Sequence, residues 1–429
     1  MVELDKVKNV AIIGGGIMGS GIAQVALLSG YEKVTIIDLN TEILEKSRET
    51  IQYRIESLES EEKFKKFISR YENTSDARQN IDFRQKMSEF KSVGVIANNV
   101  DTKTIMSRLK TETDISRGVV DADFIIEAVT EVLEVKQTVF KQLGKCVPPH
   151  ALLASNSSTI STTKIAQFSE CPERVIGMHF HTFFPIFGML IEITPGEKTV
   201  DESLKLGYEI AQKFPCLIGD RFTVELEKES PGLIANRMAM AGGLYYSWIM
   251  EEALKSGITY GQLEAAGISS EGSDSIGLDT IYYCAKYFEK YVSPEFAPSK
   301  RIEDLVKAGK LGVKVGEGYY EWNENGPIKN LESLEERTTK FLQNNIDWEL
   351  FSAISLNEGC RLLEEGVINS YDLIDKVILK GTFMPGPFML GKDKYKELVT
   401  KLDDLAEKIG KTYLKPCEMM RSGRFLSYK

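Results

Sequence analysis

Hydrophobic residues in the first half of the chain fall into short runs with helical stretches between them. The apolar runs are Val10 to Ile13, Val34 to Ile37, Phe124 to Val129, Leu152 to Ala154, Val175 to Met178 and Leu190 to Ile193. Continuous apolar runs of this length are typical of strands buried on both faces, and their alternation with helices is typical of a parallel sheet. The pattern predicts an α/β fold, a doubly wound parallel sheet, over residues 1–225.

The pattern changes after residue 225. Strand signals nearly vanish from Pro231 onward, and helical spacing takes over in Ile234 to Leu254, Ser293 to Ala308, Trp348 to Glu365 and Lys392 to Ile409. We therefore expect an all-α domain here. Trp348 to Phe425 repeats the order of Pro231 to Trp322, in which a long helix precedes a Gly-ended helix and a Gly-rich turn. This similarity predicts tandem helical repeats at 226–330 and 345–429.

A long charged interval separates the second apolar run from the third. Between Asp38 and Asp121, and above all from Glu45 to Arg70, charges of both signs occur at helical spacing. Such spacing favours an exposed helical excursion from the sheet, over about residues 41–100. A solvated helix hairpin is its simplest form.

The first apolar run leads directly into the glycines Gly14, Gly16 and Gly19, which open a helix. In a strand-turn-helix unit the first glycine allows a tight turn, the second lets the backbone approach a phosphate, and the third lets helix and strand pack closely. The helix N-terminus at Ile17 and Met18 would supply unpaired N–H groups and a positive dipole end. The pattern predicts a Rossmann-type domain that binds a dinucleotide through its pyrophosphate.

A carboxylate follows these glycines at the expected distance. Asp38 ends the second apolar run, about 20 residues after Gly19, where a dinucleotide-binding domain places the acid that holds a ribose. Its negative charge would repel a 2′-phosphate, and the next arginine is Arg48. NAD is therefore predicted over NADP.

Composition narrows the class of protein. The 429 residues are 42% hydrophobic with a net charge of −10, which suits a globular chain of two or three domains and disfavours general nucleic-acid binding. The first residues resemble neither a signal peptide nor a transit peptide, and no apolar stretch is long enough to span a membrane. We expect a cytoplasmic protein. Six scattered cysteines and three histidines predict neither a disulfide framework nor a metal site.

Histidine is the usual side chain for proton exchange near neutral pH, and the chain has only His150, His179 and His181. His179 ends an apolar run, and Glu192 lies thirteen residues later on the next one. That spacing could bring the two side chains together across neighbouring strands, where the carboxylate would orient the imidazole. The alternative is a polar histidine satisfied at a strand end.

A cluster of hydroxyl groups follows another predicted strand. Residues 155–159 read Ser-Asn-Ser-Ser-Thr and come directly after Leu152 to Ala154. The carboxyl ends of parallel strands are where α/β sheets bind ligands, so the cluster is a candidate binding segment. An ordinary helix N-cap is an equally good interpretation.

Six segments together resemble the L-3-hydroxyacyl-CoA dehydrogenase family over nearly the whole chain. They are Gly14-Gly15-Gly16-Ile17-Met18-Gly19, Glu127-Ala128-Val129-Thr130-Glu131 with Lys136, Ser155-Asn156-Ser157-Ser158, Gly177-Met178-His179-Phe180 with Glu192, Pro231 to Arg237, and Lys310 to Tyr320. The two predicted helical repeats resemble the 3-hydroxybutyryl-CoA dehydrogenase-like members.

The resemblance implies reversible hydride transfer between C3 of a 3-hydroxyacyl-CoA and C4 of the nicotinamide, giving a 3-ketoacyl-CoA in fatty-acid metabolism such as β-oxidation. It makes His179 the general base and Glu192 the group that holds its ring. Ser158 and Asn236 match the polar residues that hydrogen-bond the substrate oxygens and the histidine.

The resemblance also implies further contacts. Asp38 would hold the adenine ribose, and Glu131, Lys136, Ser158 and Lys314 would line the cofactor. Because Asn236 and Lys314 belong to the helical part, the family places its active site between the domains. A homodimer is possible, although an internal repeat could replace the partner.

Two departures from the family pattern concern the substrate. The family reads His-Phe-Phe-Asn-Pro where this chain reads His179-Phe180-His181-Thr182-Phe183-Phe184-Pro185. Thr182 or His181 could replace the missing Asn, and Phe183, Phe184 and Phe187 could shape an unusual acyl pocket or simply pack the loop. On the excursion, the family's Ser and Lys fall near Arg54 and Glu61, and neither residue type is retained. Arg54, Lys63, Lys65 and Lys66 could still meet the phosphate charge of coenzyme A, and Arg54 is the candidate contact.

Two other functions stay open from the sequence. Relatives resembling lambda-crystallin oxidise sugar acids such as L-gulonate with the same His and Glu. A non-catalytic NAD-binding protein is the third possibility, and the loss of Asn-Pro after His179 is the feature in its favour.

Overall fold

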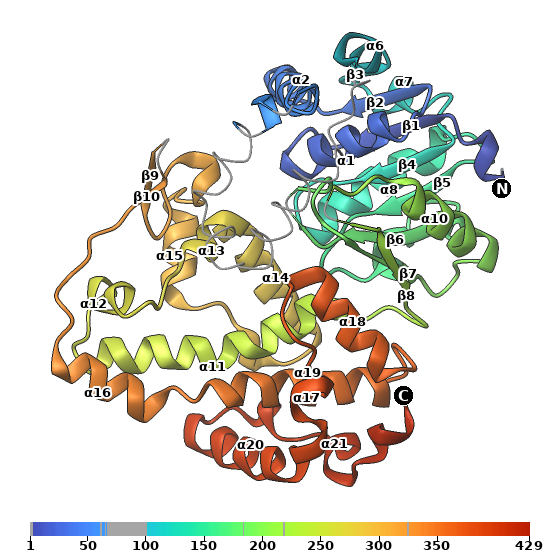
Figure 1. The fold of residues 1–429 in the computed structure, drawn as a ribbon. Coiled ribbons are helices and arrows are strands. Elements are labelled where there is room, and N and C mark those ends of the chain that lie inside the picture. The colour runs from blue at the N-terminus through green and yellow to red at the C-terminus, as the bar shows by residue number, and fades with distance from the viewer. Residues whose placement is uncertain are drawn as a thin grey trace. The chain divides into compact units, whose positions relative to one another are not determined.

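The computed structural model describes residues 3–60, 62–64, 66, 101–182, 184–217, 219–323 and 326–429. These residues form two compact units (Figure 1). The first holds the described residues up to Leu233 together with Lys380–Phe383, and the second holds Ile234–Leu379 and Met384–Lys429. Most of the predicted excursion at 41–100 lies outside the described residues. None of the described helices has the length and apolar composition needed to cross a membrane.

The first unit is built on an eight-stranded sheet in the order β3-β2-β1-β4-β5-β6-β7-β8. Its strands are β1 Asn9–Ile13, β2 Lys33–Ile37, β3 Leu109–Glu112, β4 Phe124–Glu127, β5 Leu152–Ser155, β6 Val175–Phe180, β7 Leu190–Pro195 and β8 Phe222–Glu225. All six predicted strands are present. Sequence reasoning missed β3 and β8, the two edge strands, because an edge strand is only partly buried and lacks a continuous apolar run.

Six of the seven neighbouring strand pairs are parallel, and the pair β6–β7 is antiparallel. The prediction of a doubly wound parallel sheet holds for these six pairs, and β6–β7 is the exception. The nine residues 181–189 that join the two strands are too few for a parallel crossover, which needs about a dozen or more. The chain consequently turns back on itself after β6.

Helices in the first unit connect these strands. They are α1 Ile17–Leu28, α2 Thr41–Glu56, α6 Thr102–Ser107, α7 Ile115–Gly118, α8 Leu133–Cys146, α9 Thr162–Ala166 and α10 Asp201–Lys213. The hydrophobic core contains Val10 and Ile12 of β1, Ala23 of α1 and Ile210 of α10. This apolar cluster joins the sheet to α1, α2, α6 and α10.

Helix α1 lies close to the sheet because of its glycines. Gly14 has φ +108°, and a Cβ on it would lie 2.6 Å from the Ala128 carbonyl oxygen. A Cβ on Gly19 would lie 1.8 Å from the Gly14 carbonyl oxygen, so only glycine fits there. A Cβ on Gly16 would meet no atom within 4 Å, so the turn is open on that side.

The second unit is mainly helical. It contains α11 Ala235–Lys255, α12 Tyr260–Ala265, α13 Glu271–Ile276, α14 Leu278–Tyr291, α15 Lys300–Lys307, α16 Glu336–Asn345, α17 Trp348–Glu364, most of α18 Tyr371–Thr382, α19 Pro387–Gly391, α20 Tyr395–Ile409, α21 Glu418–Ser422 and a hairpin of β9 Glu321–Asn323 and β10 Gly326–Ile328. The predicted helix Ser293 to Ala308 is interrupted, because Pro298 disfavours helical backbone at Ala297 and α15 begins only after Ser299.

The long helices α11 and α17 pack side by side in this unit (Figure 1). Arg237 of α11 donates to Glu358 of α17 at 3.1 Å and to Glu365 at 2.6 Å. Arg237 and Glu358 are both buried, so each charge depends on the other for stabilisation. These helices begin the two predicted repeats, and the repeat itself stays a prediction.

We predict that Gly19→Ala destabilises the first unit by about 3 kcal/mol, the upper end for overpacking, because the new methyl group would overlap the Gly14 carbonyl oxygen. Urea unfolding followed by circular dichroism measures this. Gly16→Ala is the matched control, since its methyl group would meet no neighbour. An equal loss in both variants would contradict the packing argument.

Candidate active site

The antiparallel pairing of β6 with β7 sets His179 directly opposite Glu192. The His179 Nδ1 lies 2.8 Å from the Glu192 Oε2, and the two side chains are 5% and 0% exposed. A buried carboxylate in this position fixes the ring orientation and stabilises a positive charge on it. The structure therefore joins the two residues that the sequence spacing suggested.

The second ring nitrogen of His179 faces the hydroxyl segment. The Ser158 Oγ, from the loop after β5, lies 3.2 Å from His179 Nε2. Glu192, His179 and Ser158 thus form one hydrogen-bonded chain, in which Nδ1 faces the carboxylate and Nε2 faces the hydroxyl group. Such an arrangement leaves Nε2 as the nitrogen that can exchange a proton with a ligand.

Glu131 holds the hydroxyl segment in place. Its Oε1 accepts hydrogen bonds from the Ser157 hydroxyl at 2.6 Å and from the backbone N–H groups of Ser158 and Thr159 at 2.9 Å. The segment does not cap the following helix, because Ser161 is the N-cap of α9. Of the two sequence interpretations of this segment, the helix cap is therefore wrong.

Charge and hydrogen bonds keep Glu131 ionised. Burial disfavours the charged carboxylate, yet its pKa lies below the ordinary value of 4.5 because Lys136 and the hydrogen bonds from Ser157 and Thr159 outweigh burial. The pKa of Lys136 is raised in the same way, since Glu127 and Glu131 outweigh the burial of its ammonium group.

Glu127 is a partner that sequence reasoning missed as a functional group. Lys136 Nζ lies 2.7 Å from Glu127 Oε1 and 3.3 Å from both the Val129 carbonyl and Glu131 Oε2. The other Glu127 oxygen accepts from the Ser155 hydroxyl at 2.6 Å. The position of Glu127 at the end of a fully buried strand was the available signal, because a buried acid requires a cation.

The glycine turn fits a dinucleotide. Ile17, at the start of α1, is 48% exposed, and the space beside Gly16 is open. Asp38 Oδ2 accepts from the Gly15 N–H at 2.9 Å, so the carboxylate lies against the turn. An open helix N-terminus beside a carboxylate is the arrangement that holds the pyrophosphate and ribose of NAD.

Thr182 and His181, the two candidates to replace the Asn of the family pattern, differ in their hydrogen bonds. Thr182 Oγ1 accepts from the Phe184 N–H at 3.1 Å, so this hydroxyl group serves the turn. Burial, and then the charge of His179, lower the pKa of His181 to about 4. His181 Nδ1 is buried and has no hydrogen-bond partner among the described residues.

The predicted aromatic pocket receives mixed support. Phe187 belongs to the hydrophobic core, and Phe183 lies outside the described residues. Arg54, buried near the end of α2, stacks on the Phe184 ring at 5.0 Å. The role of these rings in acyl selection stays a prediction, as does the contact of Arg54 with coenzyme A.

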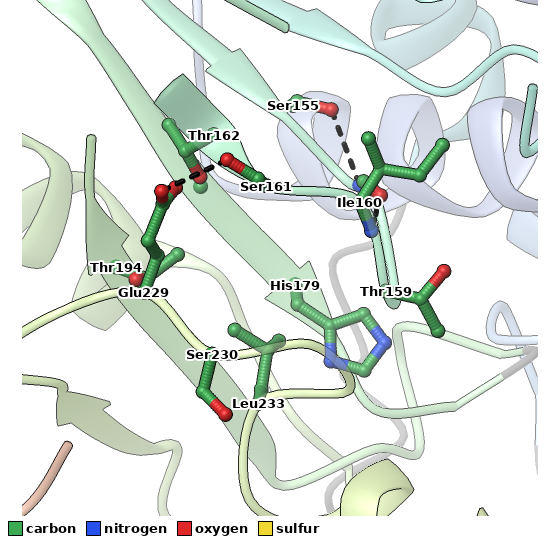
Figure 2. Close-up of a pocket in the computed structure, with 12 residues that line it drawn as sticks. Ser155, Thr159, Ile160, Ser161, Thr162, His179, Thr194, Glu229, Ser230 and Leu233 are labelled. Atoms are coloured by element: carbon green, nitrogen blue, oxygen red, sulfur yellow. Dashed lines mark hydrogen bonds between the residues drawn. The ribbon is translucent and has the colours of Figure 1, made fainter. Parts of the chain in front are cut away.

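A small pocket lies beside His179 (Figure 2). Figure 2 shows hydroxyl side chains of the segment after β5 around it, with Glu229 accepting a hydrogen bond from the Ser161 hydroxyl at 2.8 Å. Its free volume of about 10 Å³ suffices for roughly one water molecule.

Two predicted site residues lie in the second unit. Asn236 is half-buried in the first turn of α11. Lys314 lies in the short 3-10 turn Val313–Val315, and its Nζ is 2.6 Å from Asp279 Oδ1. Their contacts with substrate and cofactor stay predictions.

A mainly parallel sheet with a glycine turn after β1, a carboxylate after β2 and a buried imidazole at the end of β6 defines a Rossmann-type, NAD-binding dehydrogenase. The chain belongs to the 3-hydroxyacyl-CoA dehydrogenase family. Residues 9–216 match the model of the 3-hydroxyacyl-CoA dehydrogenase NAD binding domain, and residues 269–322 match that of the C-terminal domain.

Individual relatives agree with this assignment. The mitochondrial hydroxyacyl-coenzyme A dehydrogenase of Sus scrofa is 31% identical over 323 residues, which cover 74% of this chain and 91% of that protein. A probable 3-hydroxyacyl-CoA dehydrogenase of Caenorhabditis elegans is 30% identical over 339 residues, covering 75% and 98%. The structure of 3-hydroxybutyryl-CoA dehydrogenase from Escherichia coli K12 shares the fold, with a TM-score of 0.67 over 99% of both chains at 24% identity. The predicted family, fold class and cofactor are confirmed.

We predict that Lys136→Met lowers the free energy of unfolding by about 3–5 kcal/mol, because it leaves the buried Glu127 carboxylate without its cation. Chemical denaturation measures the loss. Lys141→Met, on the exposed face of the same helix, is the matched control and should change stability little. A similar effect of both substitutions would show that the ion pair is not responsible.

Glu131 should also make stability depend on pH. Because its folded pKa is depressed, its charged form stabilises the fold above the ordinary value of 4.5, and this contribution is lost as the pH falls through the folded pKa. Glu131→Gln removes it. The difference in unfolding free energy between wild type and variant should stay constant above that value and shrink below it. A difference independent of pH would contradict the assignment.

Proposed function

We propose that the protein catalyses the reversible, NAD-dependent oxidation of (S)-3-hydroxyacyl-CoA to 3-ketoacyl-CoA, with His179 as general base. The observation that carries the proposal is the buried pair of His179 and Glu192, 2.8 Å apart, with Ser158 on the opposite ring nitrogen. Family membership supplies the reaction class, and this pair supplies the proton acceptor that the reaction requires.

In the proposed reaction, NAD supplies the hydride acceptor. His179 Nε2 takes the proton of the 3-hydroxyl group as the hydride leaves C3, and gives it back in the reverse direction. Glu192 stays ionised, accepts the hydrogen bond from Nδ1–H and stabilises the imidazolium that forms. A positioned base of this kind contributes about 10²–10⁴ to the rate. Both side chains are buried, so water does not screen their interaction.

Ser158 is proposed to share its hydroxyl group between His179 and the substrate oxygen. Its backbone N–H and the neighbouring hydroxyl group are already held by Glu131, so the side chain is fixed before substrate arrives. This preorganisation stabilises the charge that develops on the oxygen. Asn236 is proposed as the second polar contact to the substrate.

For the cofactor, we propose that the turn at Gly14, Gly16 and Gly19 holds the pyrophosphate, with Ile17 and Met18 at the helix N-terminus. Asp38 is proposed to bind the adenine ribose. Ser158, Glu131, Lys136 and Lys314 are proposed to line the remaining cofactor, and the ion pairs of Lys136 support this by fixing the nearby loop.

The biological setting is also proposed. Oxidation of 3-hydroxyacyl-CoA is a step of fatty-acid β-oxidation, and we propose that role here. The cytoplasm remains the expected compartment, although the relative from Sus scrofa is mitochondrial by name. A homodimer stays a prediction.

The proposal predicts that the protein oxidises NADH when a 3-ketoacyl-CoA is added. The decrease in NADH absorbance should be measured with acetoacetyl-CoA and then with longer, branched, cyclic and dicarboxylic 3-ketoacyl-CoAs. NADPH is the control, and it should support little turnover because Asp38 repels the 2′-phosphate. L-gulonate oxidation with NAD is measured beside it. Turnover of L-gulonate alone would contradict the proposal. So would a protein that binds NADH but turns over neither substrate class.

A further inference from the structure

His181 lies beside the proposed base without an assigned role. Alternation along β6 and the residue after it puts His179 and His181 on the same side of the chain. Their rings meet edge to face, with centroids 5.7 Å apart. His181 Nδ1 is buried without a hydrogen-bond partner in the described part of the chain. A buried polar atom left unpaired costs about 1–3 kcal/mol, so a ligand other than the described residues would stabilise this nitrogen.

The neighbouring side chains indicate what kind of ligand this is. His179, His181 and Glu192 each offer one donor atom, and these three atoms lie within 4.8 Å of one another. Bonds of about 2.1 Å at tetrahedral angles put two ligand atoms of one Zn²⁺ ion about 3.4 Å apart. The side chains must therefore close by up to about 1.4 Å to bind the ion.

We propose that His179, His181 and Glu192 form a binding site for a borderline-soft divalent cation such as Zn²⁺, and that the cation inhibits the enzyme reversibly. Two imidazole nitrogens and one carboxylate oxygen are a ligand set that suits zinc, with water in the fourth position. The metal takes the place of the proton between His179 Nδ1 and Glu192, and that proton moves to Nε2, so the ring stays neutral as a metal ligand requires. With the cation bound, His179 is no longer available as a base.

In the loop after β6, His181 is the proposed third ligand. The Thr182 hydroxyl group already accepts a hydrogen bond from the Phe184 N–H, so it is not proposed as a ligand. The sequence expectation of no metal site rested on the scattered cysteines and the small number of histidines, which do not reveal ligands that meet through strand register. The inhibitory part rests on the proposed function, whereas the binding site does not.

Isothermal titration calorimetry of the metal-free protein with ZnCl₂ tests the site directly. We expect one Zn²⁺ per chain. His181→Phe should weaken binding by at least about tenfold, the lower bound for loss of even an outer-shell group. Phe is the residue that the family places at this position, so the variant should fold, and circular dichroism checks this. His181→Gln is the second variant if it does not.

His150→Gln is the matched control, because His150 pairs with Asp123 and lies outside the cluster. It should bind Zn²⁺ like the wild type. Co²⁺ added in place of Zn²⁺ should give the visible absorption of a low-coordinate nitrogen and oxygen site, which disappears in Glu192→Gln. Absence of binding, or equal Zn²⁺ affinity in wild type and His181→Phe, would overturn the site.

Inhibition is measured separately, as the ratio of NADH oxidation with and without Zn²⁺ in the same variant. The wild type and His150→Gln should lose activity at the Zn²⁺ concentrations that saturate the calorimetric site, and His181→Phe should require at least tenfold more. Zn²⁺ that binds at the site and leaves turnover unchanged would overturn the inhibitory part. Calorimetric binding by a protein that turns over no acyl-CoA would contradict the proposed function and support the site.

Discussion

The reversal of the chain between β6 and β7 is the constraint on which the candidate site depends. Nine residues cannot carry the chain back for a parallel strand, so β7 runs antiparallel and its register sets Glu192 against His179. A slip of one residue would turn Glu192 to the opposite face of the sheet. Two buried polar side chains then stabilise each other, because each supplies the hydrogen bond that the other needs.

Buried ion pairs fix the side chains at the ends of the neighbouring strands in the same way. Lys136 forms ion pairs with the acid at the end of β4 and with Glu131, and Glu131 holds the backbone of the loop after β5. Ser158 consequently reaches His179 from a fixed position. The glycine turn after β1 lies at the same edge of the sheet, because the carboxyl ends of parallel strands meet there. The proposed proton acceptor and the glycine turn proposed for the dinucleotide are thus built on the same sheet.

Much of this could be predicted from the sequence, since buried strands and a glycine turn leave local patterns. The central strands and the glycine turn followed from the local pattern, and the joining of His179 to Glu192 was one of the two interpretations that the spacing allowed. The edge strands β3 and β8 did not, because they are polar or short, and the direction of β7 depended on the length of a loop. The break before α15 was visible in Pro298 and was missed. The pairing of Glu127 with Lys136 and the crowding of His181 against His179 depend on tertiary contacts, which local periodicity does not encode.

The central claim is that His179 transfers the proton and does not bind the cofactor. The most direct measurement compares wild type and His179→Gln in two properties of the same samples, namely turnover of acetoacetyl-CoA with NADH and the NADH dissociation constant from fluorescence titration. The account predicts a loss of turnover by about 10²–10⁴ with NADH affinity unchanged, since the glycine turn is untouched. Retained turnover, or a parallel loss of NADH affinity, would contradict it.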